Sequence, residues 1–449
     1  MTERETQIGE AAVNQVLPWH KMLALGLQHV IAMYGGAVAV PLLLASAAGL
    51  NREQTAMLIQ ADLFTCGIAT LLQCLGAGPR AGIKLPVIMG VTFIALGPMI
   101  TISHNLGLQY IYGAVIFSGI MVLLIAPLFS RITGLFPPSV TGAIVTTIGI
   151  GLIPVAAGWA AGGEGAKDYA ANHNLLLAGF VFVFIIIVYR FSAGFINSIA
   201  VLLGIIAGSL AACVCGLADF GFAAGEPLLA AIKPFWFGIP KFNATAILSM
   251  LIVGLICMVE STGVFFALGR ITGVEITRQK LAAGYRAEGI SMVIGSIFNS
   301  FPYTTFSQNV GLVAMSGVRS RFVTAAAGCI LIVMGIIPKF AALIVCVPKA
   351  VLGGAMLIMF GMVAVVGMSI LSETDFKKPR NLMLIAVPLG IGIGVMGAHN
   401  AFNAFPPSLR IILSDGVVMC TVTAVALNLL FGNSSRRTDA LPQNKISLK

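Results

Sequence analysis

The stretch SFPYTTFSQNVGLVAMSG, Ser300 to Gly317, decides the fold expected of this chain. It lies between long apolar runs, but it contains a proline, two glycines and several hydroxyl and amide side chains. Proline breaks a continuous helix, whereas a loop in water would carry less aromatic and aliphatic bulk. Backbone that is not helical inside a membrane must line a cavity or pair within the protein, because each unpaired group costs several kcal/mol. The stretch therefore predicts a broken segment at membrane depth.

The composition of the chain is that of an integral membrane protein. Of its 449 residues, 58% are hydrophobic and 9% are charged, and the mean hydropathy is +0.99. Soluble domains carry about 25% charged residues. About 20 apolar residues cross a bilayer once, and such runs recur along the whole chain. We expect an all-α polytopic membrane protein with about 14 transmembrane segments.

The basic residues are distributed as in a multi-pass membrane protein. The net charge is +10, but no basic run or basic–aromatic alternation indicates binding to nucleic acid. If both termini are cytoplasmic, 19 of the 26 Lys and Arg residues lie inside and the other 7 outside, in accord with the positive-inside rule. The sequence thus predicts a protein of the inner (cytoplasmic) membrane with both ends inside, no cleaved signal peptide and no nucleic-acid partner.

The sequence shows no motif for a metal, an organic cofactor or an enzyme. The eight cysteines lie almost entirely in apolar runs without CxxC or Cys/His metal spacing, so they are predicted to be small core residues. GxSxG, P-loop and nucleotide-binding patterns do not occur. We expect neither a metal site nor catalysis.

A second stretch, Gly82 to Met99 (GIKLPVIMGVTFIALGPM), resembles the first one. Thr92 follows six residues after Pro86. Gln308 follows six residues after Pro302, at an offset of 216 residues. With seven spans in each half, the second half must be inverted relative to the first. Inverted repeats with matching broken segments are typical of secondary transporters, and a chance resemblance is the alternative.

The two broken stretches can satisfy each other's backbone hydrogen bonds. If Pro86–Gly90 and Pro302–Ser307 are both extended, they can pair as short strands in spans 3 and 10. Each strand would lead into a half-helix, near Val91 in one case and near Gln308 in the other. The half-helix N-termini would direct free N–H groups and positive dipole ends to the middle of the bilayer, where they would bind carbonyl oxygens or a partly anionic ring. A pair of kinked packing helices is the alternative.

Two glutamates lie within the apolar spans. Glu260 stands in LIVGLICMVESTGVFFALG, without a cation within one helical turn in the sequence. Charges inside a bilayer are costly and usually functional, and desolvation favours the neutral acid. We therefore expect Glu260 to change protonation near neutral pH, although a neutral acid bonded to a neighbouring helix is the alternative. Glu288 is nearer a cytoplasmic end and could pair with Arg286 or Arg270.

Three more polar residues of the spans can be explained by structural roles. Asp62 could cap a helix or pair with another group, and Asp415 begins the last span, where water is near. His29, in the first span, is expected to form an interhelical hydrogen bond rather than to carry a proton.

Aromatic side chains accompany the broken stretches. Phe93 and Phe306 flank the proposed crossing of the strands, next to Thr92 and Ser307. Flat apolar faces beside polar groups suit a planar heterocycle, although most phenylalanines of membrane proteins only pack.

Three motifs occur in the order found in one known family. Gln28-His29 lies in the first span, MVESTGVFFALG contains Glu260, and QNVGLVAMSG begins at Gln308. In these motifs the sequence resembles the nucleobase–ascorbate transporter family (nucleobase:cation symporter-2), from about Leu23 to Phe431. The resemblance implies fourteen spans in two inverted seven-span repeats, with a core domain and a gate domain, assembled as a homodimer.

The resemblance also implies a division of the chain. Spans 1–4 and 8–11 would form the core, and spans 5–7 and 12–14 the gate. The expected ranges are 1–21 for a cytoplasmic tail, 22–130 for core, 131–216 for gate, 217–243 for an external loop, 244–345 for core, 346–431 for gate and 432–449 for a second cytoplasmic tail.

The site residues of the family map onto matching positions. The resemblance implies hydrogen bonds to the base from Glu260 and Gln308, stacking by Phe93, backbone contacts from Phe306 and Ser307, selectivity set by Thr92, and support from Asn309 and His29. Two positions depart from the family pattern. Glu288 stands where many members have aspartate, and Val264 stands where some have an ionisable residue tied to proton coupling. The coupling would then depend on Glu260 and Glu288.

Within the family, glutamine at position 308 favours purines over uracil, because an amide offers both a donor and an acceptor to an oxopurine edge. The quoted stretches resemble most the bacterial urate and xanthine permeases. We expect a proton-coupled symporter that imports urate, xanthine or both by elevator-type movement, with the proton as its coupling ion. The alternatives are a permease for uracil or another nucleobase and, in another class, an anion exchanger or channel of the same architecture.

Overall fold

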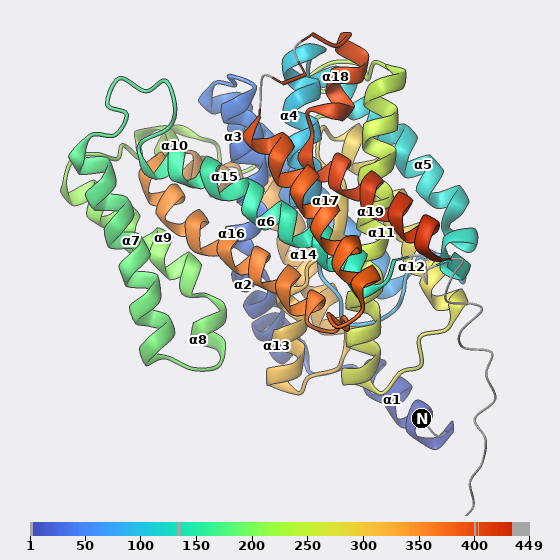
Figure 1. Ribbon diagram of the computed structural model, residues 1–449. Coiled ribbons are helices and arrows are strands. Elements are labelled where there is room, and N and C mark those ends of the chain that lie inside the picture. The colour runs from blue at the N-terminus through green and yellow to red at the C-terminus, as the bar shows by residue number, and fades with distance from the viewer. Residues whose placement is uncertain (1–2, 133–135, 399–400, 403, 433–449) are drawn as a thin grey trace, which may run out of the picture.

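The computed structural model describes residues 3–132, 136–398, 401–402 and 404–432, and the chain is predominantly helical (Figure 1). Within these residues, eight helices are long and apolar enough to cross a membrane, or nine if a pair of helices that meet at 75° counts as one span. The chain is therefore a multi-pass membrane protein. The C-terminal tail expected at 432–449 lies outside the described residues except for its first residue.

The first half of the chain contains nine α-helices, one strand and one 3₁₀ helix among the described residues. They are α1 (Glu3–Val13), α2 (Trp19–Ala47), α3 (Arg52–Leu75), β1 (Met89–Val91), the 3₁₀ helix η1 (Phe93–Ala95), α4 (Leu96–Asn105), α5 (Leu108–Ile132), α6 (Pro138–Ala160), α7 (Asn172–Phe191), α8 (Phe195–Ser198) and α9 (Ala200–Val214). Helix α1 lies within the range expected for the N-terminal tail.

The second half has a similar order of elements. They are α10 (Gly221–Gly225), α11 (Ala244–Thr272), α12 (Arg278–Ile297), β2 (Tyr303–Thr305), α13 (Gln308–Ser316), α14 (Arg321–Ile336), α15 (Pro338–Val345), α16 (Lys349–Leu371), α17 (Pro379–Gly397), α18 (Pro407–Leu413) and α19 (Gly416–Gly432). Helices α14 and α15 form the bent pair.

Local sequence explains where several of these helices begin and end. Asn51 and Gln54 form a capping box at the start of α3, each side chain accepting a hydrogen bond from the backbone of the other, which satisfies two free N–H groups. The Asn243 side chain caps α11 by accepting hydrogen bonds from Thr245 N and Ala246 N. Gly273 ends α11 at a φ of 77°, a conformation that favours glycine.

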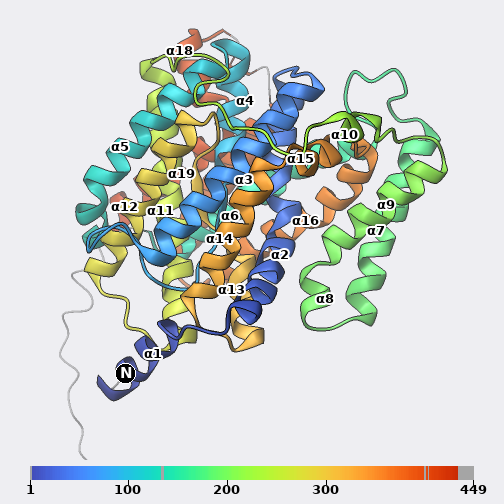
Figure 2. The same ribbon diagram turned by 180° about the vertical axis from the view of Figure 1, so that it is seen from behind.

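The helices pack in two groups. Helices α2, α3, α5, α11, α12 and α14 pack against one another around the strands, whereas α6 packs against α16, α17 against α19, and α7 against α9 and α16. Figures 1 and 2 show that α7 to α9 form the outer edge of the second group, far from α5.

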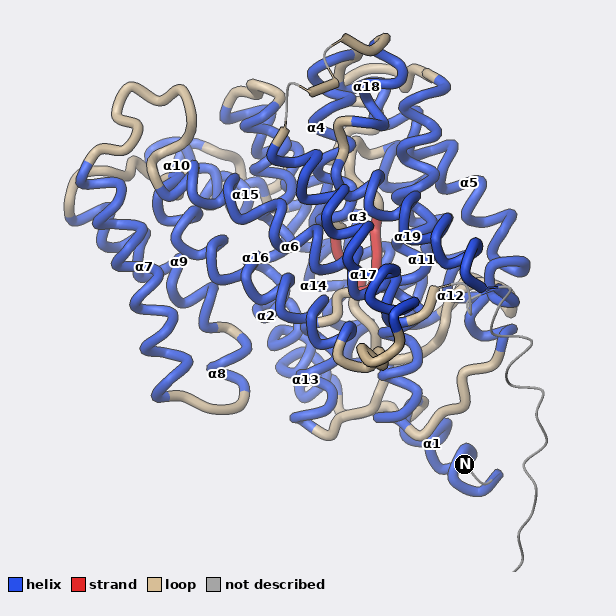
Figure 3. Tube along the Cα trace, viewed as in Figure 1, coloured by secondary structure: helices blue, strands red, loops and turns tan. Residues whose placement is uncertain are grey.

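Strands β1 and β2 meet in the middle of the molecule, where Figure 3 shows them in red among the helices. They pair antiparallel, with Gly90 opposite Thr304 at the centre. Two further bonds extend the ladder, from Phe306 N to the carbonyl of Ile88 (2.8 Å) and from Thr92 N to the carbonyl of Pro302 (3.2 Å). Strand β1 lies slightly later in the chain than the predicted extended stretch. The following helix begins two residues after the expected Val91, whereas α13 begins at the expected Gln308.

Helix α3 satisfies much of the remaining backbone of the first broken stretch. Thr70 Oγ1 accepts a hydrogen bond from Met89 N (3.1 Å), and Cys66 Sγ donates to the carbonyl of Met89 (2.7 Å). Cys74 Sγ donates to the carbonyl of Val87 (3.0 Å). These three α3 residues recur every four positions and thus lie on one face of the helix. Non-helical backbone is tolerated here because the protein supplies its partners.

Two expectations about single residues were wrong. Cys213, Cys215 and Cys329 are exposed on the protein surface and are not core residues, since the apolar surroundings of these cysteines are the outer faces of helices. Asp415 is buried rather than near water, because α18 precedes it and its Oδ1 accepts a hydrogen bond from Val418 N (2.8 Å) at the start of α19.

Candidate functional site

A cavity of about 280 Å³ lies between the strand crossing and the helices α6 and α16. Its polar side chains come from the first group of helices and the strands. Its opposite wall is apolar and belongs to α6 and α16. The lining residues are Val91, Thr92, Phe93, Ile94, Val145, Ile148, Glu260, Thr304, Thr305, Phe306, Ser307, Gln308, Met362, Val363 and Val366.

The cavity brings together most of the residues that the sequence singled out. Six of the predicted substrate-binding residues line it: Glu260, Gln308, Phe93, Thr92, Phe306 and Ser307. Three other predicted site residues, Asn309, His29 and Glu288, are buried and do not line it. The six lining residues can therefore contact a substrate in the cavity. The other three can influence the site only through the residues that line it.

Glu260 faces the cavity from the middle of α11, and the next residue fixes its position. Ser261 Oγ bonds the hydroxyl of Thr304 (3.1 Å), and it also accepts hydrogen bonds from Thr305 N (3.3 Å) and Thr305 Oγ1 (3.0 Å). Strand β2 is therefore attached to α11 beside the carboxyl. Oε2 of Glu260 is buried and has no hydrogen-bond partner among the described residues. An acceptor without a partner costs free energy, which indicates a place for a proton or a ligand donor.

Phe306 forms one side of the cavity and is fixed by two glycines. A Cβ atom at Gly90 would lie 2.3 Å from the Phe306 ring, and one at Gly36 would lie 2.7 Å from it. Both positions therefore require glycine, because β1 and α2 approach the ring too closely for any side chain. Phe93 makes an edge-to-face contact with Phe360 of α16, with ring centroids 5.3 Å apart. Phe93 follows β1 and Phe306 follows β2, so the two rings lie at opposite ends of the antiparallel ladder.

The helix N-termini at the cavity differ in their capping. Thr92 Oγ1 accepts a hydrogen bond from Ile94 N (3.1 Å) and caps η1. Ser307 precedes α13 without such a side-chain bond. Gln308, the first residue of α13, is exposed, and its Oε1 is 3.5 Å from Ser307 Oγ. A helix N-terminus carries a partial positive charge, so α13 adds a favourable field for a carbonyl oxygen at this end.

His29 and Asn309 bind each other behind the site. Asn309 Nδ2 donates to His29 Nδ1 (3.0 Å) and to the carbonyl of His29 (3.0 Å). The histidine thus forms an interhelical hydrogen bond between α2 and α13. This pair holds the start of α13, and with it Gln308, against α2.

Glu288 is fully buried on α12 and pairs with neither candidate arginine in the described part of the chain. Arg286 instead donates to the carbonyl of Arg80 (3.2 Å). The α-helix directs residues 286 and 288 to different faces, because they are two positions apart. Glu288 lies near Ser261 and Glu260. Glu288 is therefore a second carboxyl group near Glu260, but it does not line the cavity.

The sequence did not single out the cluster around Asp62. Asp62 Oδ1 accepts hydrogen bonds from Tyr303 OH (3.0 Å) and from Ser300 Oγ (3.2 Å), and Tyr303 OH also bonds Thr65 Oγ1. The cluster fixes the face of β2 opposite to Thr304. A stripe of polar residues three or four positions apart in an apolar span (Asp62, Thr65, Cys66, Thr70, Gln73 and Cys74) was the signal that could have revealed it.

The arrangement suits a flat, polar ring more than a metal ion. The cavity offers one carboxyl, one amide, several hydroxyls and two aromatic rings. Among the described residues, no group of three or more His, Cys, Asp or Glu side chains could hold a metal ion. Directional hydrogen bonds at the edges and apolar contact at the faces are what a small planar heterocycle requires.

Comparison with known proteins gives consistent matches along the chain. Residues 20–401 match the sequence model Xan_ur_permease, described as a permease family. A nucleobase transporter of Paenibacillus larvae, PlUacP, is 48% identical over 93% of this chain and 96% of its own. A xanthine permease of Bacillus subtilis is 45% identical, over 93% and 95% of the two chains. A uric acid permease of that organism, PucJ, is 45% identical, over 95% and 96%.

A solved structure has a related fold. The transmembrane domain of the cyanobacterial bicarbonate transporter BicA superposes with a TM-score of 0.58 at 17% identity, over 93% of this chain and 99% of that one. At that identity the match describes the fold and not the ligand.

Proposed function

Because the chain belongs to this permease family, which is the nucleobase–ascorbate transporter family whose motifs it carries, we propose that it is a proton-coupled symporter that imports urate, xanthine or both across the cell membrane. It is a transporter and not an enzyme. The relatives named above are a nucleobase transporter, a xanthine permease and a uric acid permease. They support a purine as the substrate.

The observation that carries the proposal is the position of Glu260 and Gln308 in one small cavity with two phenylalanines. A purine presents N–H and C=O groups along its edges and two apolar faces. The carboxyl would bind N–H groups at one edge, and the amide would bind a neighbouring N–H and C=O pair at another. Phe93 and Phe306 would contact the faces, where aromatic rings stack favourably.

The buried Oε2 atom of Glu260, which has no hydrogen-bond partner among the described residues, supports coupling to a proton. An ionised carboxylate beside the ring would repel a substrate that is itself anionic. Among the described residues that line the cavity, no lysine or arginine offsets this repulsion. A proton on Glu260 removes this repulsion and lets the carboxyl donate a hydrogen bond. Glu288 lies close enough to influence that protonation. The proton would therefore enter with the substrate and leave after it.

We also propose the finer architecture that the sequence predicted: fourteen spans in inverted repeats, a core over 22–130 and 244–345, and a gate over 131–216 and 346–431. The two packing groups support this division, because the polar side of the cavity belongs to one and the smooth apolar wall to the other. A smooth wall permits one group to slide past the other without breaking hydrogen bonds. This supports our proposal of elevator-type movement of the core. We propose that it takes place in each subunit of a homodimer, as the family resemblance implies.

The test is uptake by purified protein in liposomes. Labelled urate, xanthine and uracil are offered with an acidic exterior, with no pH gradient, and with a gradient dissipated by a protonophore. We expect accumulation of a purine, unmodified, only with the acidic exterior, and much less uracil. Equal uptake without the gradient would contradict proton coupling. Preferential uptake of uracil would show that the substrate is a pyrimidine and not a purine. Exchange of small inorganic anions without purine uptake would indicate an anion exchanger.

A further inference from the structure

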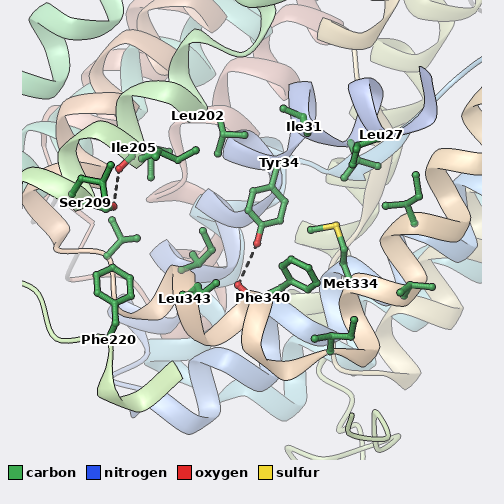
Figure 4. Close-up of a pocket in the computed structure, with 18 of the residues that line it drawn as sticks. Leu27, Ile31, Tyr34, Leu202, Ile205, Ser209, Phe220, Met334, Phe340 and Leu343 are labelled. Atoms are coloured by element: carbon green, nitrogen blue, oxygen red, sulfur yellow. Dashed lines mark hydrogen bonds between the residues drawn. The ribbon is translucent and has the colours of Figure 1, made fainter. Parts of the chain in front are cut away.

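A second cavity, of about 860 Å³, lies away from the substrate site, between α2 and α14–α15 on one side and α9 on the other (Figure 4). Leu27 and Ile31 of α2, Leu202 and Ile205 of α9 and Met334 of α14 belong to its walls. Helix α2 is long and apolar enough to cross a membrane, α14 and α15 form the bent pair, and α9 is a shorter apolar helix. Other lining residues are strongly exposed, among them Leu210 (63%) and Val333 (54%). The cavity is therefore a groove that opens to the surroundings of the helices, which are the lipids of the bilayer.

The few polar side chains in this groove already have partners. Figure 4 shows two dashed bonds: Tyr34 OH donates to the carbonyl of Phe340 (3.3 Å), and Ser209 Oγ donates to the carbonyl of Ile205 (2.7 Å). Among the described residues, no charged side chain lines the groove. A polar ligand would lose its water here and gain no hydrogen bond from a side chain in return, which is unfavourable. Water itself needs two to four polar partners in a buried site, so it does not suit the groove either.

The length of the groove matches one leaflet of a membrane. Its lining runs along α2 from Leu23 to Tyr34 and along α9 from Leu202 to Cys213. Each stretch corresponds to about 16 Å of helix, at about 1.5 Å per residue. The hydrocarbon core of a bilayer is about 30 Å thick, so one leaflet contributes about 15 Å.

From these observations we propose that the groove binds the acyl chain of a membrane lipid, inserted between α2 and α9. The apolar walls, the satisfied hydroxyls, the open side and the length all fit a chain that enters from the adjoining leaflet. The proposal concerns binding alone and does not depend on which solute the protein carries.

The test uses the full-length protein in liposomes that contain a trace of phosphatidylcholine with a diazirine near the end of one acyl chain. After irradiation, labelled residues are mapped by mass spectrometry. We expect labelling of the groove residues of α2 and α9 several-fold above that of Leu176 and Val183, which are exposed on α7 and do not line the groove. Equal labelling of both surfaces would mean ordinary contact with bulk lipid and would overturn the proposal.

Matched variants decide whether the groove itself is responsible. Cys213→Trp fills the groove, whereas Val214→Trp adds the same bulk to the adjacent residue, which is 89% exposed and does not line it. We expect the first variant to reduce groove labelling several-fold and the second to leave it unchanged. Should Cys213→Trp lower the melting temperature, Cys329→Phe fills the groove from α14 with a smaller change. Labelling that persists in a folded, filled variant contradicts acyl-chain binding, as do cross-links between two copies of α9 at this position, which would make the groove a subunit interface.

Discussion

The two broken segments of the chain are alike in outline but are held in different ways. The backbone of the first, around β1, is bonded by side chains of α3, such as Thr70 on Met89. The second, around β2, uses its own side chains: Tyr303 reaches Asp62 of α3, and Thr304 and Thr305 reach Ser261 of α11. The first segment is thus a scaffold enclosed by α3, whereas the second is a connection between α3 and α11.

This difference suggests that the first segment serves mainly packing and the second mainly recognition of the substrate. The first segment contributes a capping threonine and an aromatic ring to the cavity wall, and a glycine that lies against the Phe306 ring. The second contributes Gln308, and its attachment to α11 brings Glu260 beside it. Changes near the second segment should therefore alter uptake and selectivity in a folded protein, while changes in the first should first alter folding.

The largest effect is expected from Glu260→Gln. The amide keeps the size of the side chain but can neither carry the proton nor offer the O–H group of a protonated acid to an anionic ring. A hydrogen bond to a charged group contributes about 1.5–3 kcal/mol, so substrate binding should weaken about 10- to 100-fold, and uptake driven by the pH gradient should be lost. Labelled-purine uptake in liposomes measures this. Glu275→Gln, an exposed position after α11, is the matched control and should transport normally. Coupled uptake at the normal rate in Glu260→Gln would refute the role of this carboxyl.

The next effect concerns selectivity through Gln308. Replacement by alanine removes two neutral hydrogen bonds of about 0.5–1.5 kcal/mol each and should raise the KM for a purine about tenfold. Gln308→Glu should shift the preference among bases, because it replaces the amide donor by an acceptor. Competition of uracil, xanthine and urate for uptake measures both.

Thr92 tests whether the first segment lacks this role in recognition, against the role in selectivity that the family resemblance implies for Thr92. Thr92→Ser retains the hydroxyl that caps η1 and should leave both stability and selectivity unchanged. Thr92→Val removes the cap and should lower stability by about 1 kcal/mol without changing the order of preference. A changed order in Thr92→Val would remove the distinction between the segments.

A glycine in each segment gives a fourth test. Gly90→Ala would place a Cβ atom 2.3 Å from the Phe306 ring, whereas no atom outside the helix backbone lies within 4 Å of a Cβ at Gly311. Overpacking of this kind costs about 1–3 kcal/mol, so Gly90→Ala should melt at a lower temperature and lose part of its uptake. Gly311→Ala should melt slightly higher, because alanine is the better helix former. Equal melting temperatures for the two variants would show that the first segment has more room than the contacts with Phe306 imply.

Much of this arrangement could be predicted from particular residues. Pro86 and Pro302, each six residues before a polar side chain, indicated where the helices break, and the isolated Glu260 indicated the cavity. The family was predicted from three short motifs, and the comparisons confirm it. Local sequence carries such information because proline and an unpaired buried charge have few structural solutions.

Other features depend on distant contacts that no short motif encodes. The isolated sequence could not show that Ser261 and Asp62 both bind β2, since the residues are 43 or more positions apart from their partners in the chain. The burial of Asp415 and the exposure of Cys329 depend on how whole helices are packed. Glu288 illustrates the same limit, because its sequence neighbour Arg286 is directed elsewhere by the helix.

The smallest effect is expected where the half-helices end. Helix α4, which lies in the range proposed for the core, ends beside α18, which lies in the range proposed for the gate. Arg410 Nη2 donates to Asn105 Oδ1 (2.6 Å) between them, at the end of the molecule opposite to α1 (Figure 1). At the end of α13, the hydrogen bonds of Ser316 in the described chain stay within its own turn. The contact at α4 thus favours a state in which the two groups are joined on that side. Arg410→Ala should shift the balance toward the opposite opening by about 0.5–1 kcal/mol, a factor of about 2–5.

Accessibility of the cavity from each side measures that shift. A cysteine at Val366, in the apolar wall of the cavity, is treated with a membrane-impermeant maleimide applied from one side at a time. In Arg410→Ala and in Asn105→Ala, modification should become about 2–5 times faster from the side of α18 and slower from the side of α13. Asn105→Asp retains an acceptor for the guanidinium and should behave like the parent protein. Modification that is as fast in Asn105→Asp as in Asn105→Ala would show that this contact does not join core and gate. The ends of α4 and α13 would then not differ in how they contact the gate.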